Sequence, residues 1–203
     1  MKIVNSKFYQ VLEKITNYFF LNAIWLLVSL PIVTLFPATA AMFAVQRGWI
    51  RKTDNRVFGS FLEHFKRNFK HSFFYGLLWI AFVAILLIDL EIVAEFDQTI
   101  NFIMTAILLS IGMVIAFNTA YIFPIMVHYD LSFKGKIKQA FMYSLMYFPT
   151  TILCILIGLV TILSVLFLPP LMFISFSVGS YLVLRLCLRT FRKVEEKISK
   201  SAE

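Results

Sequence analysis

Charged residues are missing from three long stretches of this chain, residues 15–46, 98–127 and 139–184. A soluble domain can bury a core, but it cannot hide uncharged stretches of this size, since one membrane-spanning helix needs only about 20 apolar residues. Overall, 60% of the 203 residues are hydrophobic and 15% are charged. The mean hydropathy of +0.83 also lies outside the range of ordinary soluble domains. The sequence therefore predicts one integral membrane domain over residues 1–203.

Sequence motifs with known catalytic chemistry are missing as well. The chain has no H-E-x-x-H, no phosphate-binding P-loop, no G-x-S-x-G and no C-x-x-C. His64 and His71 are seven residues apart, and this separation of about 10 Å along a helix is too large for both to bind one metal ion. We therefore expect a non-enzymatic protein with no catalytic residue, no cofactor and no metal.

Cysteine is scarce, which excludes a disulfide-rich fold. Cys154 lies in the middle of an apolar stretch and Cys187 lies near the end of the last one. We expect the two thiols to lie at different depths, without a disulfide, as small apolar residues.

Basic residues outnumber acidic residues, 19 to 11, and they fall in four clusters, residues 2–14, 47–70, 134–138 and 185–200. Lys and Arg of short loops are retained on the cytoplasmic side, so all four clusters should share that side. A net charge of +8 is typical of many nucleic-acid-binding proteins, but these basic residues flank apolar stretches, where anionic lipid headgroups lie. We therefore expect membrane lipids as partners and no nucleic acid, with both termini cytoplasmic.

The predicted class is all-α, a polytopic membrane helical bundle. Four full spans are expected at residues 72–90, 101–127, 140–168 and 171–188, followed by a cytoplasmic tail at residues 189–203. Pro169 and Pro170 should divide the last two spans, and Pro124 should break the second.

The first hydrophobic segment, residues 15–46, is interrupted by Pro31 and Pro37. A single crossing there would place the amino-terminal lysines opposite the other basic clusters. A re-entrant pair of half-helices removes this conflict, provided that neighbouring helices bury the broken backbone. The alternative is a kinked ordinary span with an external N-terminus.

Two basic amphipathic segments should lie at the membrane interface, one at residues 57–71 and one at residues 131–141. In each, aromatic residues recur at helical spacing beside lysines, a pattern typical of helices that bind headgroups or dock a partner. A shift of 72 residues superposes Ser60 on Ser132 and Tyr75 on Tyr147, which indicates either an internal repeat or chance matches in a Phe- and Lys-rich chain. The candidate lipid or partner contacts are Phe61, Phe65, Lys66, Arg67, Phe69, Lys70, Lys134, Lys136 and Lys138.

A few polar residues lie within the apolar stretches, and such residues usually have a partner or a task. The candidate intramembrane polar cluster is Asn22, Asn118, Thr119 and Tyr121. None is ionisable at neutral pH, so no proton relay is indicated. We expect hydrogen bonds between helices, with a substrate-facing cluster as the alternative.

Specific sequence similarity is concentrated in the first third of the chain. Asn22, the run W-L-L-V-S-L-P-I-V-T at residues 25–34, P-A-T-A-A at residues 37–41 and F-K-R-N-F-K at residues 65–70 resemble the YesL-like family of bacterial membrane proteins. This chain has Phe36 where the family pattern has Gly. The resemblance implies a bacterial plasma-membrane protein of uncharacterised activity, often encoded beside carbohydrate uptake and degradation systems.

Three functional hypotheses follow. The leading one, which rests on the resemblance, is an accessory or regulatory membrane protein for a sugar ABC permease or for the membrane sensor that controls one. The second is a small transporter or channel, compatible with a homo-oligomer, that uses the proline-broken first segment and the Asn118 region. The third is a membrane enzyme with His64, His71, His128 and Asp130 on its cytoplasmic side.

Overall fold

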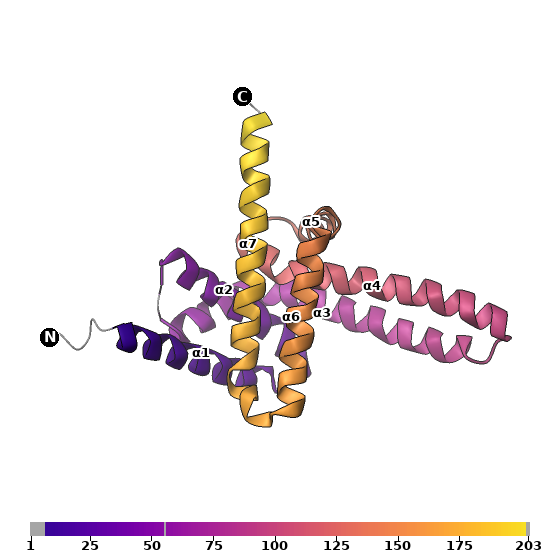
Figure 1. Ribbon diagram of the computed structural model, residues 1–203, viewed down its shortest axis with the longest axis horizontal. Helices are drawn as coiled ribbons and strands as arrows, with labels where there is room; N and C mark the ends of the chain where they lie inside the picture. The colour runs from indigo at the N-terminus through magenta and orange to yellow at the C-terminus, as the bar shows by residue number, and fades with distance from the viewer. Residues whose placement is uncertain (1–6, 55, 202–203) are drawn as a thin grey trace.

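The structure is a computed structural model that describes residues 7–54 and 56–201 (Figure 1). Its elements are α1 (Lys7–Ser29), η1 (Ile32–Thr34), α2 (Leu35–Arg51), α3 (Phe58–Val93), α4 (Gln98–His128), α5 (Phe133–Met146), α6 (Phe148–Phe167), η2 (Pro169–Phe173) and α7 (Ser175–Ser201). The described residues contain no strand, so the predicted all-α class is confirmed.

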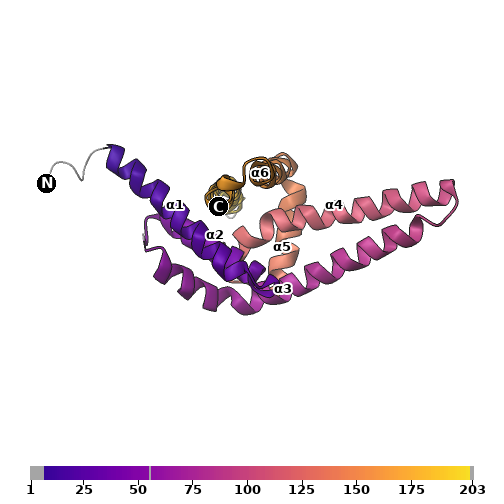
Figure 2. The same ribbon diagram turned by 90° about the horizontal axis from the view of Figure 1, so that it is seen from below.

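Two helical hairpins dominate the shape of the molecule. The α3–α4 hairpin extends far from the body, and the α6–α7 hairpin runs across it, as Figures 1 and 2 both show. Helix α2 packs against α1, α3, α4 and α7, so it contacts both hairpins. The described residues therefore form two splayed hairpins joined by a common core.

The first hydrophobic segment turns at Pro31. Helix α1 ends two residues earlier at Ser29, whose hydroxyl donates a hydrogen bond to Trp25 O at 2.6 Å. The Thr34 hydroxyl then donates to Val28 O at 2.5 Å, which satisfies a carbonyl at the end of the helix. Proline restricts the residue before it to extended conformations, so the helix ends here.

Helix α2 then returns alongside α1 and is the most buried helix of the fold. Every residue from Phe36 to Gln46 except Thr39 is buried. Pro37 does not break the chain as predicted, because it lies in the first turn of α2, where its missing N–H has no intrahelical partner. Lys52 ends the helix with a φ of 57°, the left-handed conformation common at helix ends. Whether this segment re-enters the membrane or crosses it stays a prediction.

The predicted boundaries of two later segments differ from the helices observed. The predicted interfacial segment at residues 57–71, except Val57, and the predicted span at residues 72–90 belong to one uninterrupted 36-residue helix, α3. The predicted span at residues 140–168 is instead divided between α5 and α6 at Tyr147, where the backbone leaves the helical region (φ −117°, ψ 50°). Pro149 explains this break, since proline is accepted in the first turn of a helix but not in its interior. The Thr151 hydroxyl donates to Ser144 O at 2.7 Å and so satisfies a carbonyl freed by the break.

The break predicted at Pro124 is wrong, because α4 continues through this buried residue to His128. Pro169 and Pro170 do divide α6 from α7, through the short helix η2. The two copies of the predicted 72-residue repeat differ in structure at one matched position, since α3 continues through Tyr75 whereas the corresponding Tyr147 lies at a break. The repeat itself stays a prediction.

Four helices within the described residues are long and apolar enough to cross a membrane. They are Val11–Ser29 of α1, together with α3, α4 and α6. Three of them coincide with predicted spans. The fourth predicted span, residues 171–188, falls on η2 and on α7, and it contains Arg185. A crossing by α7 stays a prediction.

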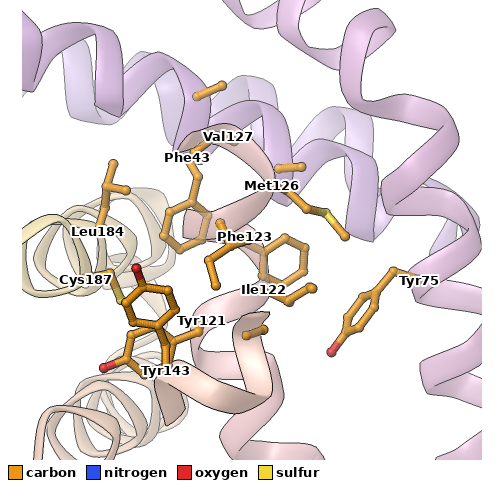
Figure 3. Close-up of a cluster of buried hydrophobic side chains, with 14 of the residues drawn as sticks. Phe43, Tyr75, Tyr121, Ile122, Phe123, Met126, Val127, Tyr143, Leu184 and Cys187 are labelled. Atoms are coloured by element: carbon orange, nitrogen blue, oxygen red, sulfur yellow. The ribbon is translucent and has the colours of Figure 1, made fainter. Parts of the chain in front are cut away.

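An aromatic core lies where α2, α4, α5 and α7 meet (Figure 3). Phe43 of α2 stacks on Phe123 of α4 with ring centroids 5.8 Å apart and planes inclined by 4°. Phe36 lies 6.0 Å from Phe123 and 5.7 Å from Trp79. Such ring contacts add about 0.5–1.5 kcal/mol each to the effect of burial.

Gly76 of α3 makes the closest approach to this core. A Cβ atom at position 76 would lie 2.6 Å from Cδ2, 2.7 Å from Cγ and 3.1 Å from Cβ of Phe36, so rotation of the ring alone would not remove the overlap. We predict that Gly76→Ala lowers the free energy of unfolding in detergent by about 1–2 kcal/mol, because overpacking exceeds the gain in helix propensity.

Gly59→Ala is the matched control, because a Cβ atom at this exposed position has no neighbour within 4 Å. Thermal unfolding should show a stability that is unchanged or raised by up to about 1 kcal/mol. Equal effects of the two substitutions would contradict the proposed contact between Phe36 and α3.

Candidate functional site

An open apolar cleft of about 820 Å³ lies between the two hairpins. Trp79 and Leu87 of α3 line one side, and Ile162 of α6 and Val183 of α7 line the other. Helix α2 forms the base through Phe36. Leu87 and Ile162, which belong to different hairpins, are 57% and 52% exposed. The cleft is therefore open at these two residues.

Small residues make one wall of the cleft smooth. Gly112, Ala116 and Ala120 follow one another at intervals of four along α4, and all three line the cleft. Gly158 of α6 lines it as well, and a Cβ atom there would have no neighbour within 4 Å. In lipid, such small residues allow two helix backbones to approach closely.

The polar groups that reach the cleft already have hydrogen-bond partners. Trp25 Nε1 donates to Thr39 Oγ1 at 3.1 Å, and Trp79 Nε1 donates to Thr119 Oγ1 at 3.1 Å. The Thr161 hydroxyl donates to Ile157 O of its own helix at 2.7 Å. The cleft therefore suits an apolar occupant rather than an ion or a sugar.

The predicted intramembrane polar residues do not form one cluster. Asn118 accepts from Tyr75 Oη at 3.2 Å and donates to Ile137 O at 3.1 Å, so it joins α4 to α3 and α5. Thr119 is part of the same network. Asn22 instead donates to Met172 O at 2.5 Å, between α1 and η2, and Tyr121 is buried in the aromatic core. The expected hydrogen bonds between helices are thus present for both asparagines.

The predicted contact residues of the two basic segments divide into an exposed group and a buried group. Lys66, Arg67, Phe69 and Lys70 are exposed on α3, as are Lys134 and Lys138 on α5, and Phe65 is half-buried. Two of the predicted contacts are wrong. Phe61 is 0% exposed and belongs to the core formed by α1 and α2, and Lys136 is only 5% exposed. Lys136 lies two residues from each exposed lysine of α5, so it points to a different helix face.

Lys136 instead faces α3, where its Nζ lies 3.1 Å from Nδ1 of His71. Burial lowers the pKa of Lys136, and Arg67 lowers it further, whereas the carboxylate of Asp130 acts in the opposite direction. The described residues show no carboxylate within 4.0 Å of this ammonium group. A lysine buried without an ion pair is uncommon. Its neighbours come from α3, so the sequence of α5 alone does not reveal its burial.

Arg47 at the end of α2 belongs to the same basic face. Its Nη2 donates to His128 O at 3.4 Å. Burial lowers its pKa, as do the nearby positive charges of Arg51 and Arg67. Asp54 lies beside this face and is held ionised, because hydrogen bonds from Ser60 and Arg56 lower the pKa of its carboxyl group. Basic groups from α2, α3 and α5 therefore converge on one face.

The two cysteines correct another expectation. Cys154 of α6 and Cys187 of α7 are both buried and free, and their sulfur atoms are 4.0 Å apart. They lie at the same level and not at different depths, because the α6–α7 hairpin places residues on either side of its turn next to each other. No group of three or more metal-ligating residues occurs in the described part of the chain.

This geometry defines an all-α, multi-pass membrane protein with an apolar cleft between two hairpins and a basic face to which α2, α3 and α5 contribute residues.

Residues 18–90 match the family described as "Protein of unknown function, DUF624". The uncharacterized protein YesL of Bacillus subtilis (strain 168) is 32% identical over 187 residues, which cover 89% of this chain and 88% of YesL. YesV of the same organism is 32% identical over 171 residues, or 82% of either chain. YteU is 29% identical over 189 residues, covering 91% of this chain and 85% of YteU. No solved structure matches the chain. The chain therefore belongs to the YesL-like family, which confirms the resemblance.

The burial of Lys136 predicts a specific pH dependence of stability. Its pKa is lower in the folded state than in the unfolded state, so the unfolded state binds more protons between the two values. The contribution of Lys136 to stability therefore becomes less unfavourable as pH rises toward the usual lysine pKa of about 10.4. We predict that Lys136→Met stabilises the fold near neutral pH and that this advantage shrinks as the pH is raised.

Chemical denaturation in detergent, from neutral pH up to the usual lysine pKa of about 10.4, measures the difference in the free energy of unfolding between the Lys136→Met protein and the parent. Lys193→Met, at an exposed position of α7, is the control and should show no such trend. A constant difference between the Lys136→Met protein and the parent at every pH would contradict the prediction.

Proposed function

We propose that the protein is a non-enzymatic accessory subunit that holds a transmembrane helix of another membrane protein in the cleft between α3–α4 and α6–α7. The observation that carries this proposal is the open cleft itself, with its apolar lining and its wall of Gly112, Ala116 and Ala120. The open side of the cleft leaves these lining residues accessible to the side chains of a partner helix.

Helix association in lipid depends mainly on close packing, because lipid tails are as apolar as the helix surface. A partner helix with complementary side chains would gain many contacts along the small-residue wall of α4. The α3–α4 hairpin extends away from the body (Figure 2), so it would present this wall without a large rearrangement.

The family resemblance favours a particular partner. We propose a carbohydrate ABC permease, or the membrane sensor that controls one, as the protein that supplies this helix. The charge distribution supports a bacterial plasma membrane location with both termini in the cytoplasm, because the basic face and the tail of α7 would then meet the same anionic leaflet.

The transporter and enzyme alternatives have less support. The amide of Asn118 joins α4 to Tyr75 of α3 and to Ile137 of α5, so its hydrogen bonds already serve helix packing. The candidate enzyme residues have structural partners: His71 contacts Lys136, and His128 contacts Glu195 at 3.3 Å.

The test is co-purification from the native membrane in mild detergent, with quantitative mass spectrometry of the accompanying proteins. Gly158→Phe would project into the cleft without meeting another residue first. Leu159→Phe introduces the same ring at the next, lipid-exposed position of α6 and is the matched control.

We predict that a sugar permease or sensor accompanies the parent and the Leu159→Phe protein. Its recovery should fall at least about tenfold with Gly158→Phe, which corresponds to about 1.4 kcal/mol of binding free energy. Undiminished recovery of the permease or sensor with the Gly158→Phe protein would show that the cleft is not the binding site for the partner helix. Purification of this chain alone, together with solute flux in liposomes that contain nothing else, would favour the transporter.

A further inference from the structure

From a second groove we infer that the protein binds one anionic phospholipid, with an acyl chain along α3 and α4 and the headgroup phosphate between Lys134 and Lys138 of α5. This groove has a volume of about 450 Å³ and is separate from the cleft, with which it shares only Trp79 and Ile115. The inference does not depend on the proposed accessory function.

The body of the groove accepts only an apolar chain. Leu78 and Phe82 of α3, Val114 of α4 and Phe141 of α5 line it. The amide of Asn118, which also reaches the groove, already accepts from Tyr75 Oη and donates to Ile137 O. A polar ligand in this part would lose hydrogen bonds to water without regaining them.

The end of the groove formed by α5 is strongly basic. Lys134 and Lys138 are four residues apart, so they lie on the same helix face and repel each other. Helix α5 contains three lysines and no acidic residue, and Lys134 lies in its first turn, where the helix dipole favours negative charge. Neither exposed lysine has an ion-pair partner within 4.0 Å among the described residues. One phosphate between the two lysines would offset both their mutual repulsion and the unfavourable position of Lys134 at the positive end of the helix dipole.

An adjacent groove indicates that the lipid has two chains. It has a volume of about 590 Å³, shares Leu78 with the first groove and is lined by Phe74, Leu77 and Phe133. Lys70 and His71 lie at its end. The contact of His71 with Lys136 joins α3 to α5 beside the grooves, and Figure 2 shows α5 lying across the hairpin. Two apolar grooves with basic groups at one end match the two tails and single headgroup of a phospholipid.

The excess of positive charge around the grooves favours an anionic headgroup over a zwitterionic one. Choline and ethanolamine headgroups carry an ammonium group that would lie among these lysines, whereas phosphatidylglycerol carries only the negative charge. The site therefore discriminates by charge, and its place beside the basic face puts it in the cytoplasmic leaflet.

The experiment is a titration of the delipidated protein in detergent with phosphatidylglycerol or with phosphatidylcholine of the same chain length, followed by native mass spectrometry. The charge variant combines Lys134→Gln with Lys138→Gln. The control combines Arg189→Gln with Lys193→Gln, which removes the same charge from two exposed positions, also four residues apart, on α7. A third variant, Val114→Trp, fills the apolar part and leaves the charge unchanged.

We expect one phosphatidylglycerol per chain, bound at least about tenfold more tightly than phosphatidylcholine, and a similar loss in the α5 charge variant. Val114→Trp should also weaken binding, whereas the α7 control should not. Circular dichroism and gel filtration establish that each variant is folded.

Several results would overturn the inference. Equal binding of the two lipids, or equal losses in the α5 and α7 variants, would indicate unspecific attraction to a basic surface. Retained binding in the α5 charge variant would show that Lys134 and Lys138 do not bind the headgroup phosphate. Glycerol phosphate that binds as tightly as the lipid would identify a site for a free anion instead.

Discussion

The packing of helix α2 against α1, α3, α4 and α7 is the constraint on which the rest of the structure depends. Its small residues allow four helices to approach one short helix, and Phe36 and Phe43 fill the space between them. Gly76 is required at the closest contact, because a side chain there would meet the ring of Phe36. With α2 in the middle, both long hairpins pack against the same helix and diverge away from it.

This separation has a functional consequence. Two hairpins packed side by side would cover their own apolar surfaces, whereas crossed hairpins leave an apolar cleft with exposed walls. In a bilayer, lipid tails or another helix must occupy that space. The small-residue wall of α4 favours a helix, and the basic groups of α5 favour an anionic lipid in the neighbouring groove. Apart from Trp79 and Ile115, the two sites are lined by different residues.

Several features could be predicted from local sequence alone. The uncharged stretches predict membrane helices, and Pro31, Pro169 and Pro170 mark turns, because these signals act over a few neighbouring residues. The break at Tyr147 had a local signal too, in Pro149, but the length of the surrounding apolar stretch concealed it. Pro37 and Pro124 show the limit of this reasoning, because proline in a first turn costs little and tight packing can hold a helix together around a buried proline.

The sequence by itself determined the membrane class, the family and the clustering of positive charge, since composition and local pattern specify these properties. Only the tertiary structure decided which residues meet. It brought Cys154 to Cys187, buried Lys136 against His71 and moved Phe61 into the core. The cleft cannot be recognised in any single segment of the sequence, because residues of six helices line it. Contacts of this kind follow from the angles at which helices pack, and those angles depend on side chains far apart in the chain.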